Sequence, residues 1–117
     1  MKKLIPWLAI GLILIAGIVH LIDAQDAYQE AAYKGILFYS HFLVSLLIAI
    51  GIFQNIPSAW KLGAVISIIS ISLYCLSRSV GLPMIPAEPD AWFEPLGVIS
   101  FVAEGLFIFL ALKRRLD

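Results

Sequence analysis

Four apolar stretches, each about the length needed to cross a lipid bilayer, dominate this chain of 117 residues. They cover residues 4–22, 35–53, 62–80 and 95–112. A transmembrane helix needs about 20 mainly apolar residues, and inside a bilayer only helices and closed barrels satisfy their own backbone hydrogen bonds. The segments between the stretches are short. The sequence therefore predicts an all-α, up-down-up-down transmembrane four-helix bundle, in a single domain over residues 1–117.

The composition supports a membrane protein and argues against nucleic-acid binding. Hydrophobic residues make up 62% of the chain and charged residues only 14%, whereas about a quarter of a soluble domain is charged. The formal net charge is zero, so no general attraction to nucleic acid is expected. The first apolar stretch is too long for a signal peptide and lacks a small-residue cleavage site, so we expect an uncleaved first helix.

The distribution of basic residues predicts the orientation in the membrane. Cytoplasmic segments of membrane proteins carry an excess of Lys and Arg. Only Lys34 and Arg78 fall on one side of the predicted bundle, and the remaining basic residues fall on the other. Those remaining residues are Lys2, Lys3, Lys61, Lys113, Arg114 and Arg115. Both termini are therefore expected in the cytoplasm, with an acidic face on the outer side.

Glu104 is the most costly residue in these stretches. It lies roughly 13 Å below Pro95 at 1.5 Å per helical residue, and no basic residue is closer in sequence than Lys113. An ionisable residue at such depth needs a partner and marks a functional site by default. The candidate partners are His20, His41 and Arg78. We expect Arg78 to compensate the charge, directly or through a shared water.

The polar residues of the four stretches fall on helix faces that can point toward one another. The third stretch carries Ser67, Ser70, Tyr74 and Ser77 at spacings of 3, 4 and 3, which is one face of a helix. Small and weakly polar residues on such a face also serve simply as a packing surface between membrane helices. The ionisable residues require more than packing. Together they predict an outward-facing polar pocket lined by His20, His41, Tyr74, Arg78 and Glu104.

Several functions fit such a pocket. His20 and His41 on adjacent antiparallel helices could ligate a transition metal or a haem, with Glu104 as a third, oxygen ligand to the metal. Buried carboxylate, imidazole and guanidinium groups also suit a small ligand, or a proton or small-solute pathway through an oligomer. Alternatively, the cluster fixes the register of an accessory subunit of a larger membrane complex. No nucleophile–base pair with recognisable spacing supports an enzyme.

Three segments of the chain resemble a known group of proteins. They are Y-C-L-S-R-S-V-G-L-P at 74–83, E-P-D-A-W-F-E-P-L-G-V-I-S-F-V-A-E at 88–104, and His20-Leu21 followed by an acidic stretch and Y-K-G-I-L-F at 33–38. They resemble a family of small, uncharacterised bacterial four-helix membrane proteins, in which an S-R-x-x-G-L-P turn precedes an E-P-x-G stretch and an intramembrane glutamate. The matching positions are His20, Arg78, Gly81, Pro83, Glu94, Gly97 and Glu104.

The resemblance implies a multi-pass protein of the plasma (inner) membrane and supplies no activity. It adds Glu94 to the candidate ligand-binding residues. His41 has no matching position in the family, which weakens a model with two histidine ligands. Homo-oligomers and larger membrane complexes are the expected partners besides the lipid bilayer.

Overall fold

The protein is a bundle of four long helices. The computed structural model describes the backbone of residues 4–116 and the side chains of residues 4–114. The helices are α1 (Leu4–Glu30), α2 (Ala32–Phe53), α3 (Pro57–Ser79) and α4 (Pro95–Leu116), with a short 3-10 helix η1 (Pro89–Ala91) before α4. Each of the four is long and apolar enough to cross a membrane, and the described residues form no β-strand. The predicted all-α, four-helix class is confirmed.

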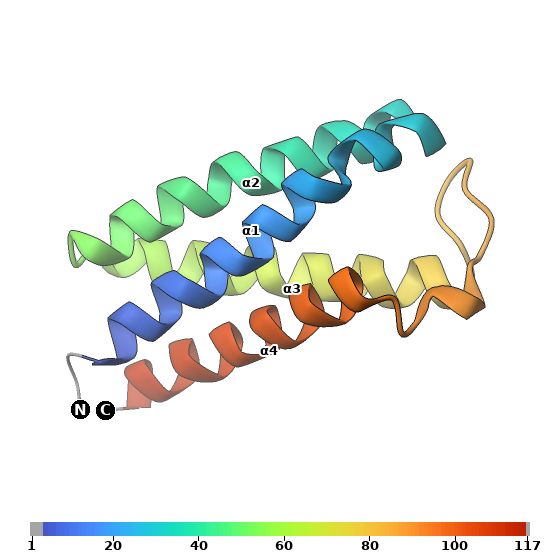
Figure 1. Ribbon diagram of the computed structural model, residues 1–117. Coiled ribbons are helices and arrows are strands. Elements are labelled where there is room, and N and C mark those ends of the chain that lie inside the picture. Colours follow the sequence, from blue (N-terminus) through green and yellow to red (C-terminus); the bar gives the residue numbers. More distant parts are fainter. Residues whose placement is uncertain (1–3, 117) are drawn as a thin grey trace.

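The helices form a ring in which each packs against two neighbours. The packed pairs are α1 with α2, α2 with α3, α3 with α4, and α4 with α1. Helices α1 and α3 run in one direction and α2 and α4 in the other (Figure 1). We call the end with the α1–α2 and α3–α4 connections the loop end. The opposite end, where α1 begins and α4 ends, is the terminal end.

The turn between α1 and α2 differs from the prediction. The first apolar stretch ends at residue 22 and the second begins at residue 35, but α1 continues to Glu30 and only Ala31 leaves the helical conformation, with φ −160° and ψ 136°. Residues 23–30 contain no Gly or Pro and are mostly good helix formers. The tight hairpin depends on Gly35, where a Cβ would lie 2.6 Å from Tyr28 Cα. Only glycine allows the two helices to approach this closely.

Helix α3 begins earlier than the apolar pattern indicates. It starts at Pro57 instead of residue 62, and a proline suits the first helical position because its missing N–H would have no partner there. The preceding turn needs only Gln54, Asn55 and Ile56. Asn55 has φ 61°, a left-handed conformation that asparagine tolerates better than most residues. The segment 57–61, which contains a proline and polar residues and lies outside the apolar stretch, thus extends the helix by about a turn.

The connection from α3 to α4 is irregular and folds back on the bundle. Helix α3 ends with the Gly81 N–H donating to the Leu76 carbonyl over 2.7 Å, and Gly81 has φ 93°. A Cβ there would also lie 2.9 Å from Ala87 N. Glycine is therefore required both for the positive φ and for the close approach of the loop backbone. Residues 80–94, which we call the Pro-rich loop, are then held by the Tyr33 hydroxyl, which donates to the Pro83 carbonyl over 2.5 Å.

The hydrophobic core occupies the terminal half of the bundle. Its buried members are Ala9, Ile13, Ile48, Ala49, Ile52, Ala59, Trp60 and Phe107. Glycines let the helices approach closely here. A Cβ on Gly51 would lie 2.6 Å from Ala59 Cβ, and one on Gly63 would meet the Phe107 ring. Small residues at such contacts are the usual means of packing helices in membranes.

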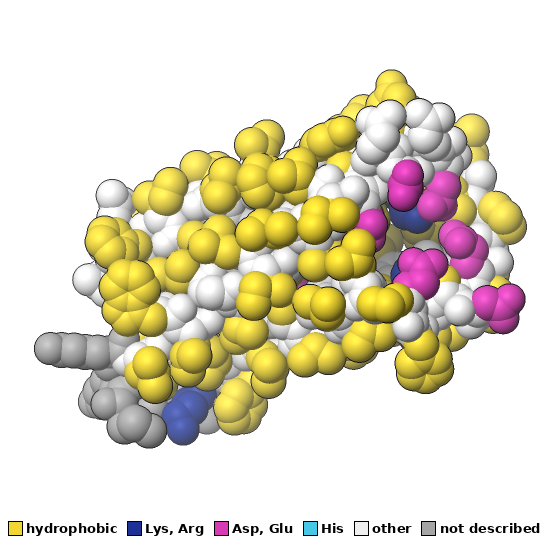
Figure 2. All heavy atoms as spheres, in the orientation of Figure 1, with side chains coloured by type: hydrophobic (Ala, Val, Ile, Leu, Met, Phe, Trp, Pro, Cys, Tyr) yellow, Lys and Arg dark blue, Asp and Glu magenta, His cyan; other side chains and the backbone are white. Residues whose placement is uncertain are grey.

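The surface divides along the long axis of the bundle. Apolar side chains cover its flank, and acidic side chains gather around a hollow at the loop end (Figure 2). Large exposed side chains on the flank include Leu47, Phe53, Leu62 and Phe109. An apolar flank with a charged end is the surface expected of a helix bundle in a bilayer.

Candidate functional site

Three ionisable side chains from three helices meet at mid-bundle. His20 comes from α1, His41 from α2 and Glu104 from α4. One ligand atom from each lies within 4.8 Å of the others. The side chains of His41 and Glu104 are 7% and 1% exposed, and His20 is partly buried. We call these three residues the His–Glu cluster, and the structure brings together the three positions that the sequence suggested as metal ligands.

The Glu104 carboxylate is fixed through one of its oxygens. Ser100, one turn earlier in α4, donates to Oε1 over 2.7 Å. Ser70 of α3 donates to the same oxygen over 2.9 Å. The other oxygen, Oε2, is buried and has no hydrogen-bond partner among the described residues. The serine faces of α3 and α4, which alone would suggest only packing, therefore position the carboxylate.

His20 is fixed through Nδ1. This nitrogen lies 2.8 Å from the Ala16 carbonyl one turn earlier in α1. A carbonyl only accepts hydrogen bonds, so Nδ1 carries the hydrogen and Nε2 of the neutral ring presents a lone pair. Ser70 Oγ lies 3.4 Å from this Nε2. The single Ser70 hydroxyl proton already serves Glu104 at the shorter distance, so Nε2 of His20 stays poorly satisfied.

His41 is fixed in the same way. Its Nδ1 lies 3.2 Å from Ser45 Oγ, one turn further along α2. Its Nε2 is buried without a hydrogen-bond partner and lies 3.8 Å from Glu104 Oε1. In the tautomer that donates from Nδ1 to Ser45, Nε2 presents a second lone pair to the cluster.

The two imidazole rings lie flat against each other. Their centroids are 3.7 Å apart and their planes differ by 4°. Two axial ligands of one haem approach the iron from opposite faces of the porphyrin. Rings in direct stacking contact leave no space for a porphyrin between them, so the predicted pair of haem ligands does not fit this geometry.

A cavity of about 280 Å³ extends from the His–Glu cluster toward the loop end. Apolar side chains make up most of its wall, among them Leu37, Phe38, Val44, Ile66, Ile69, Leu73 and Phe101. Toward the loop end the wall includes Asp23, Lys34, Tyr74 and Arg78. The cavity is therefore apolar in the middle and polar at both ends.

Arg78 does not compensate Glu104, contrary to the prediction. Its Nε donates to the Ala91 carbonyl over 3.2 Å, and its Nη1 donates to Ser77 Oγ over 2.7 Å. Its guanidinium carbon lies 3.8 Å from the centroid of the Tyr74 ring, a cation–π contact. Arg78 is eight residues beyond Ser70 on α3, about 12 Å along the helix axis, and its side chain is directed to the Pro-rich loop.

Tyr74 and Arg78 together attach the Pro-rich loop to α3. The Tyr74 hydroxyl donates to the Trp92 carbonyl, beside the contact of Arg78 with Ala91. No described carboxylate lies within 4.0 Å of the guanidinium, whereas Lys34 Nζ pairs with Glu30 Oε2 at 2.9 Å. Arg78 is thus a fixed cation on the cavity wall that makes no salt bridge among the described residues, and Asp23 of the same wall acts on its charge at longer range.

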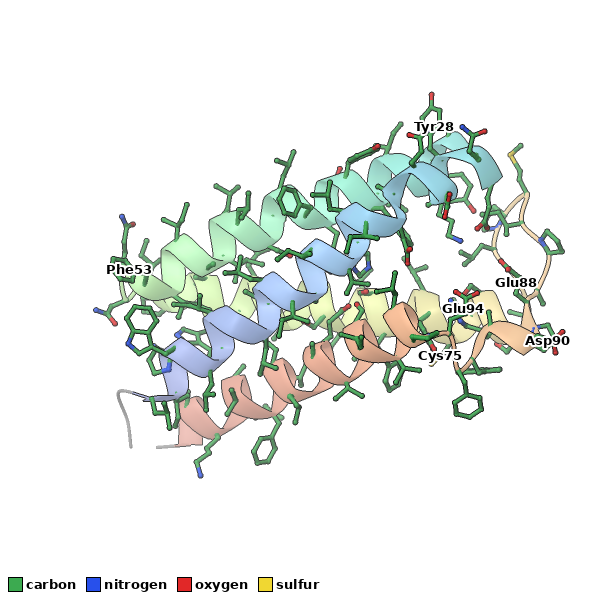
Figure 3. All side chains as sticks on the ribbon, in the orientation of Figure 1. Tyr28, Phe53, Cys75, Glu88, Asp90 and Glu94 are labelled. Atoms are coloured by element: carbon green, nitrogen blue, oxygen red, sulfur yellow. The ribbon has the colours of Figure 1, made fainter. Side chains whose placement is uncertain are left out.

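Glu94 does not line the cavity but lies near its rim, where its charge acts on Asp23 of the cavity wall. It is exposed immediately before α4 and is not among the residues that line the cavity. Figure 3 shows it at the loop end with Glu88 and Asp90. These acids contribute to the acidic rim around the hollow, inside which basic side chains are recessed (Figure 2).

Comparisons of this chain with protein-family models, with curated proteins and with solved structures find no match. The chemistry of the site therefore has to follow from its geometry. Sequence reasoning found the ionisable residues and the polar helix faces, but it did not assign Ser45, Ser70 and Ser100 the role of holding them. A signal for two of these was present, since Ser45 and Ser100 each lie one helical turn from the residue that they fix.

Proposed function

We propose that this protein is a multi-pass membrane protein that binds a small amphiphile in the cavity at its loop end. The proposal rests on the 280 Å³ cavity, whose apolar wall lies between fixed polar groups. Ligand sites in proteins are typically apolar cavities of roughly 300–1,000 Å³ with a few precisely placed polar groups. The cavity is just below that range, so it suits one short chain or one ring.

The two polar ends of the cavity suggest the chemistry of the ligand. Arg78 offers a guanidinium held in place by Ser77, Ala91 and the Tyr74 ring. Because no described carboxylate lies within 4.0 Å of it, the guanidinium suits a ligand with a hydrogen-bond-accepting or anionic head group. The apolar wall between Arg78 and the His–Glu cluster would take the body of the ligand. An amphiphile of this kind is already concentrated in a bilayer.

We also propose an orientation for the bundle in a plasma membrane, with the terminal end on the cytoplasmic side. Lys61, Lys113 and Arg114 lie at the terminal end, while the acidic residues gather at the loop end (Figure 2). This supports cytoplasmic termini and a cavity that opens on the outer side; Lys2 and Lys3 are outside the described residues.

In a Cys75→Ser background, a membrane-impermeant maleimide should label Asp90→Cys and not Ser58→Cys in intact cells. Labelling of Ser58→Cys alone would reverse the orientation.

A pair of leucine substitutions tests the ligand. Leu73 lines the cavity, whereas Leu76, three residues further along α3, is 44% exposed and does not. Leu73→Trp should fill the cavity and remove at least nine-tenths of the bound amphiphile, and Leu76→Trp should retain it. The measurement is native mass spectrometry of protein purified in mild detergent, with identification of the molecules extracted from it.

Two results would contradict ligand binding. One is wild-type protein that carries only the lipid mixture of the surrounding membrane. The other is equal retention of the same molecule by Leu73→Trp and Leu76→Trp. If instead a larger membrane complex co-purifies and no ligand does, the accessory-subunit alternative replaces the proposal.

A further inference from the structure

We propose that the His–Glu cluster binds one divalent first-row transition metal ion. The ligands are Nε2 of His20, Nε2 of His41 and the Glu104 carboxylate, whose Oε2 is the free oxygen. The site lies at the floor of the cavity and goes beyond the proposed amphiphile site. Neither site needs the other to be occupied, so their tests fail separately.

The first argument is that each of the three side chains is anchored through one atom, while the second ligand atom is unpartnered in His41 and Glu104 and has only a 3.4 Å contact with Ser70 Oγ in His20. His20 Nδ1 is bonded to Ala16 O, His41 Nδ1 to Ser45 Oγ, and Glu104 Oε1 to Ser70 and Ser100. Metal-binding histidines almost always donate their second ring N–H to a carbonyl, carboxylate or other acceptor, which fixes the tautomer and the ring orientation. The hydrogen bonds of the cluster are those of a prepared metal site.

The second argument is the cost of the free atoms without an ion. His41 Nε2 and Glu104 Oε2 are both buried and unpartnered among the described residues, and their side chains are 93% or more removed from solvent. A buried polar group without a partner costs about 1–3 kcal/mol, and more if it is charged. The Ser70 hydroxyl of α3 has one proton and already donates it to Oε1 of Glu104. A bound cation would satisfy all three side chains at once.

The third argument is distance. Donor atoms around a tetrahedral ion with bonds of about 2.1 Å lie roughly 3.4 Å apart. One possible ligand atom of each residue lies within 4.8 Å of those of the other two, and His41 Nε2 is 3.8 Å from Oε1, the anchored oxygen of Glu104. These distances are close to those of coordination, and binding would also require at least one imidazole to rotate out of the stack, so that both Nε2 lone pairs point at one ion.

The donor set indicates the class of metal. Imidazole nitrogens suit Zn²⁺, Fe²⁺, Ni²⁺ and Cu²⁺, whereas Mg²⁺ and Ca²⁺ prefer oxygen ligands. Two histidines and one carboxylate leave at least one coordination position open, as in sites that bind an exogenous ligand. Here the three ligands line the floor of the cavity, so the open position faces it. One carboxylate neutralises half the charge of the ion, and an anionic ligand from the cavity would neutralise the rest.

Metal titration of the purified protein tests the site. Protein stripped with a chelator is titrated with Co²⁺ and Zn²⁺ in mild detergent, and the visible absorption of Co²⁺ reports its coordination. We expect one ion per chain. His41→Ala and Glu104→Gln should weaken binding at least 100-fold. Ser100→Ala keeps all three ligands but removes one anchor, and should weaken binding 10–100-fold.

Two controls separate this site from other possible ligands. Cys75→Ser removes the only thiol in the chain, and Asp23→Asn removes a different cavity carboxylate; both should bind metal like the wild type. Glu104→Gln preserves the shape of the side chain and an acceptor for Ser70 and Ser100, so its metal-free form should fold. If it does not fold, Ser100→Ala decides the question.

The proposal is overturned if the stripped wild type binds neither Co²⁺ nor Zn²⁺ at millimolar concentration. Binding by folded Glu104→Gln with wild-type affinity would also overturn it, as would unchanged binding by Ser100→Ala where Glu104→Gln does not fold. A cluster that holds only a water or a shared proton gives the first of these results.

Discussion

The two halves of the bundle are built from the same four helices but packed in different ways. In the terminal half, glycine and alanine allow close helix contacts, and Ile13, Ile48, Ile52 and Phe107 fill the space between them. In the loop half, the α1–α2 pair and the α3–α4 pair diverge (Figure 1), and the space between them is a cavity lined in part by ionisable groups. The terminal half is a packed apolar core, and the loop half contains the cavity and its ionisable groups.

This difference indicates how a small membrane protein can carry an incompletely packed, polar region. The close contacts of the terminal half supply dispersion energy over a large apolar area. At the loop end, the Pro-rich loop is hydrogen-bonded to α2 by Tyr33 and to α3 by Tyr74 and Arg78. The two helical pairs are thus joined at both ends of the cavity. Stability and function are expected to reside in different halves.

The largest effect should come from truncating the centre of the terminal half. Phe107 is fully buried, and Phe109 in the same helix is 61% exposed. Phe107→Ala should lower the free energy of unfolding by about 3–5 kcal/mol, because it leaves a cavity in the core. Phe109→Ala should change it by about 0.5 kcal/mol or less. Unfolding in mixed micelles with a denaturing detergent measures both, and equal effects would contradict the assignment of the core.

A smaller effect should come from adding one methyl group at a helix contact of the terminal half. Gly51→Ala places a Cβ 2.6 Å from that of Ala59, whereas a Cβ on Gly11 meets nothing within 4 Å. Gly51→Ala should lower the free energy of unfolding by about 1–3 kcal/mol through overpacking. Gly11→Ala should leave it unchanged or raise it by up to about 1 kcal/mol, since alanine is the better helix former. The same unfolding assay compares them.

The smallest effect should have the opposite sign and come from the loop half. Glu104→Leu removes a buried carboxylate with an unpartnered oxygen, and the freed hydroxyls of Ser70 and Ser100 can bond carbonyls of their own helices. Stability should stay the same or rise by about 1 kcal/mol, as is common where a site is kept at the expense of stability. A loss above about 2 kcal/mol would show that Glu104 is structural glue and that the contrast between the halves is wrong.

The sequence predicted the four helices well because the apolar stretches are long and interrupted at the turns. It predicted helix boundaries less well. The α1–α2 turn is at Ala31 because nothing before it breaks the helix, and because Gly35 allows close approach to Tyr28. Such a contact joins residues that are not neighbours on one helix face, so local periodicity does not reveal it.

The partner of Glu104 likewise depends on how the helices pack and not on local periodicity alone. Periodicity placed Glu104 and Ser100 on one face of α4, and Ser70, Tyr74 and Ser77 on one face of α3. It could not give the relative rotation and axial offset of the two helices, so the strongest opposite charge, Arg78, was the expected partner. The structure sets Ser70 level with Glu104 and places Arg78 nearer the loop end.

The sequence by itself determined that this chain forms four apolar helices, and that His20, His41 and Glu104 are ionisable residues whose burial in those helices costs free energy. It could do so because hydrophobicity and helical period are local properties. Only the tertiary structure decided that these three meet, that each is held by a neighbour through one atom, and that His41 and Glu104 each keep a second atom without a partner. Those facts depend on the offsets between helices and on side-chain rotamers, which are set by packing across the bundle.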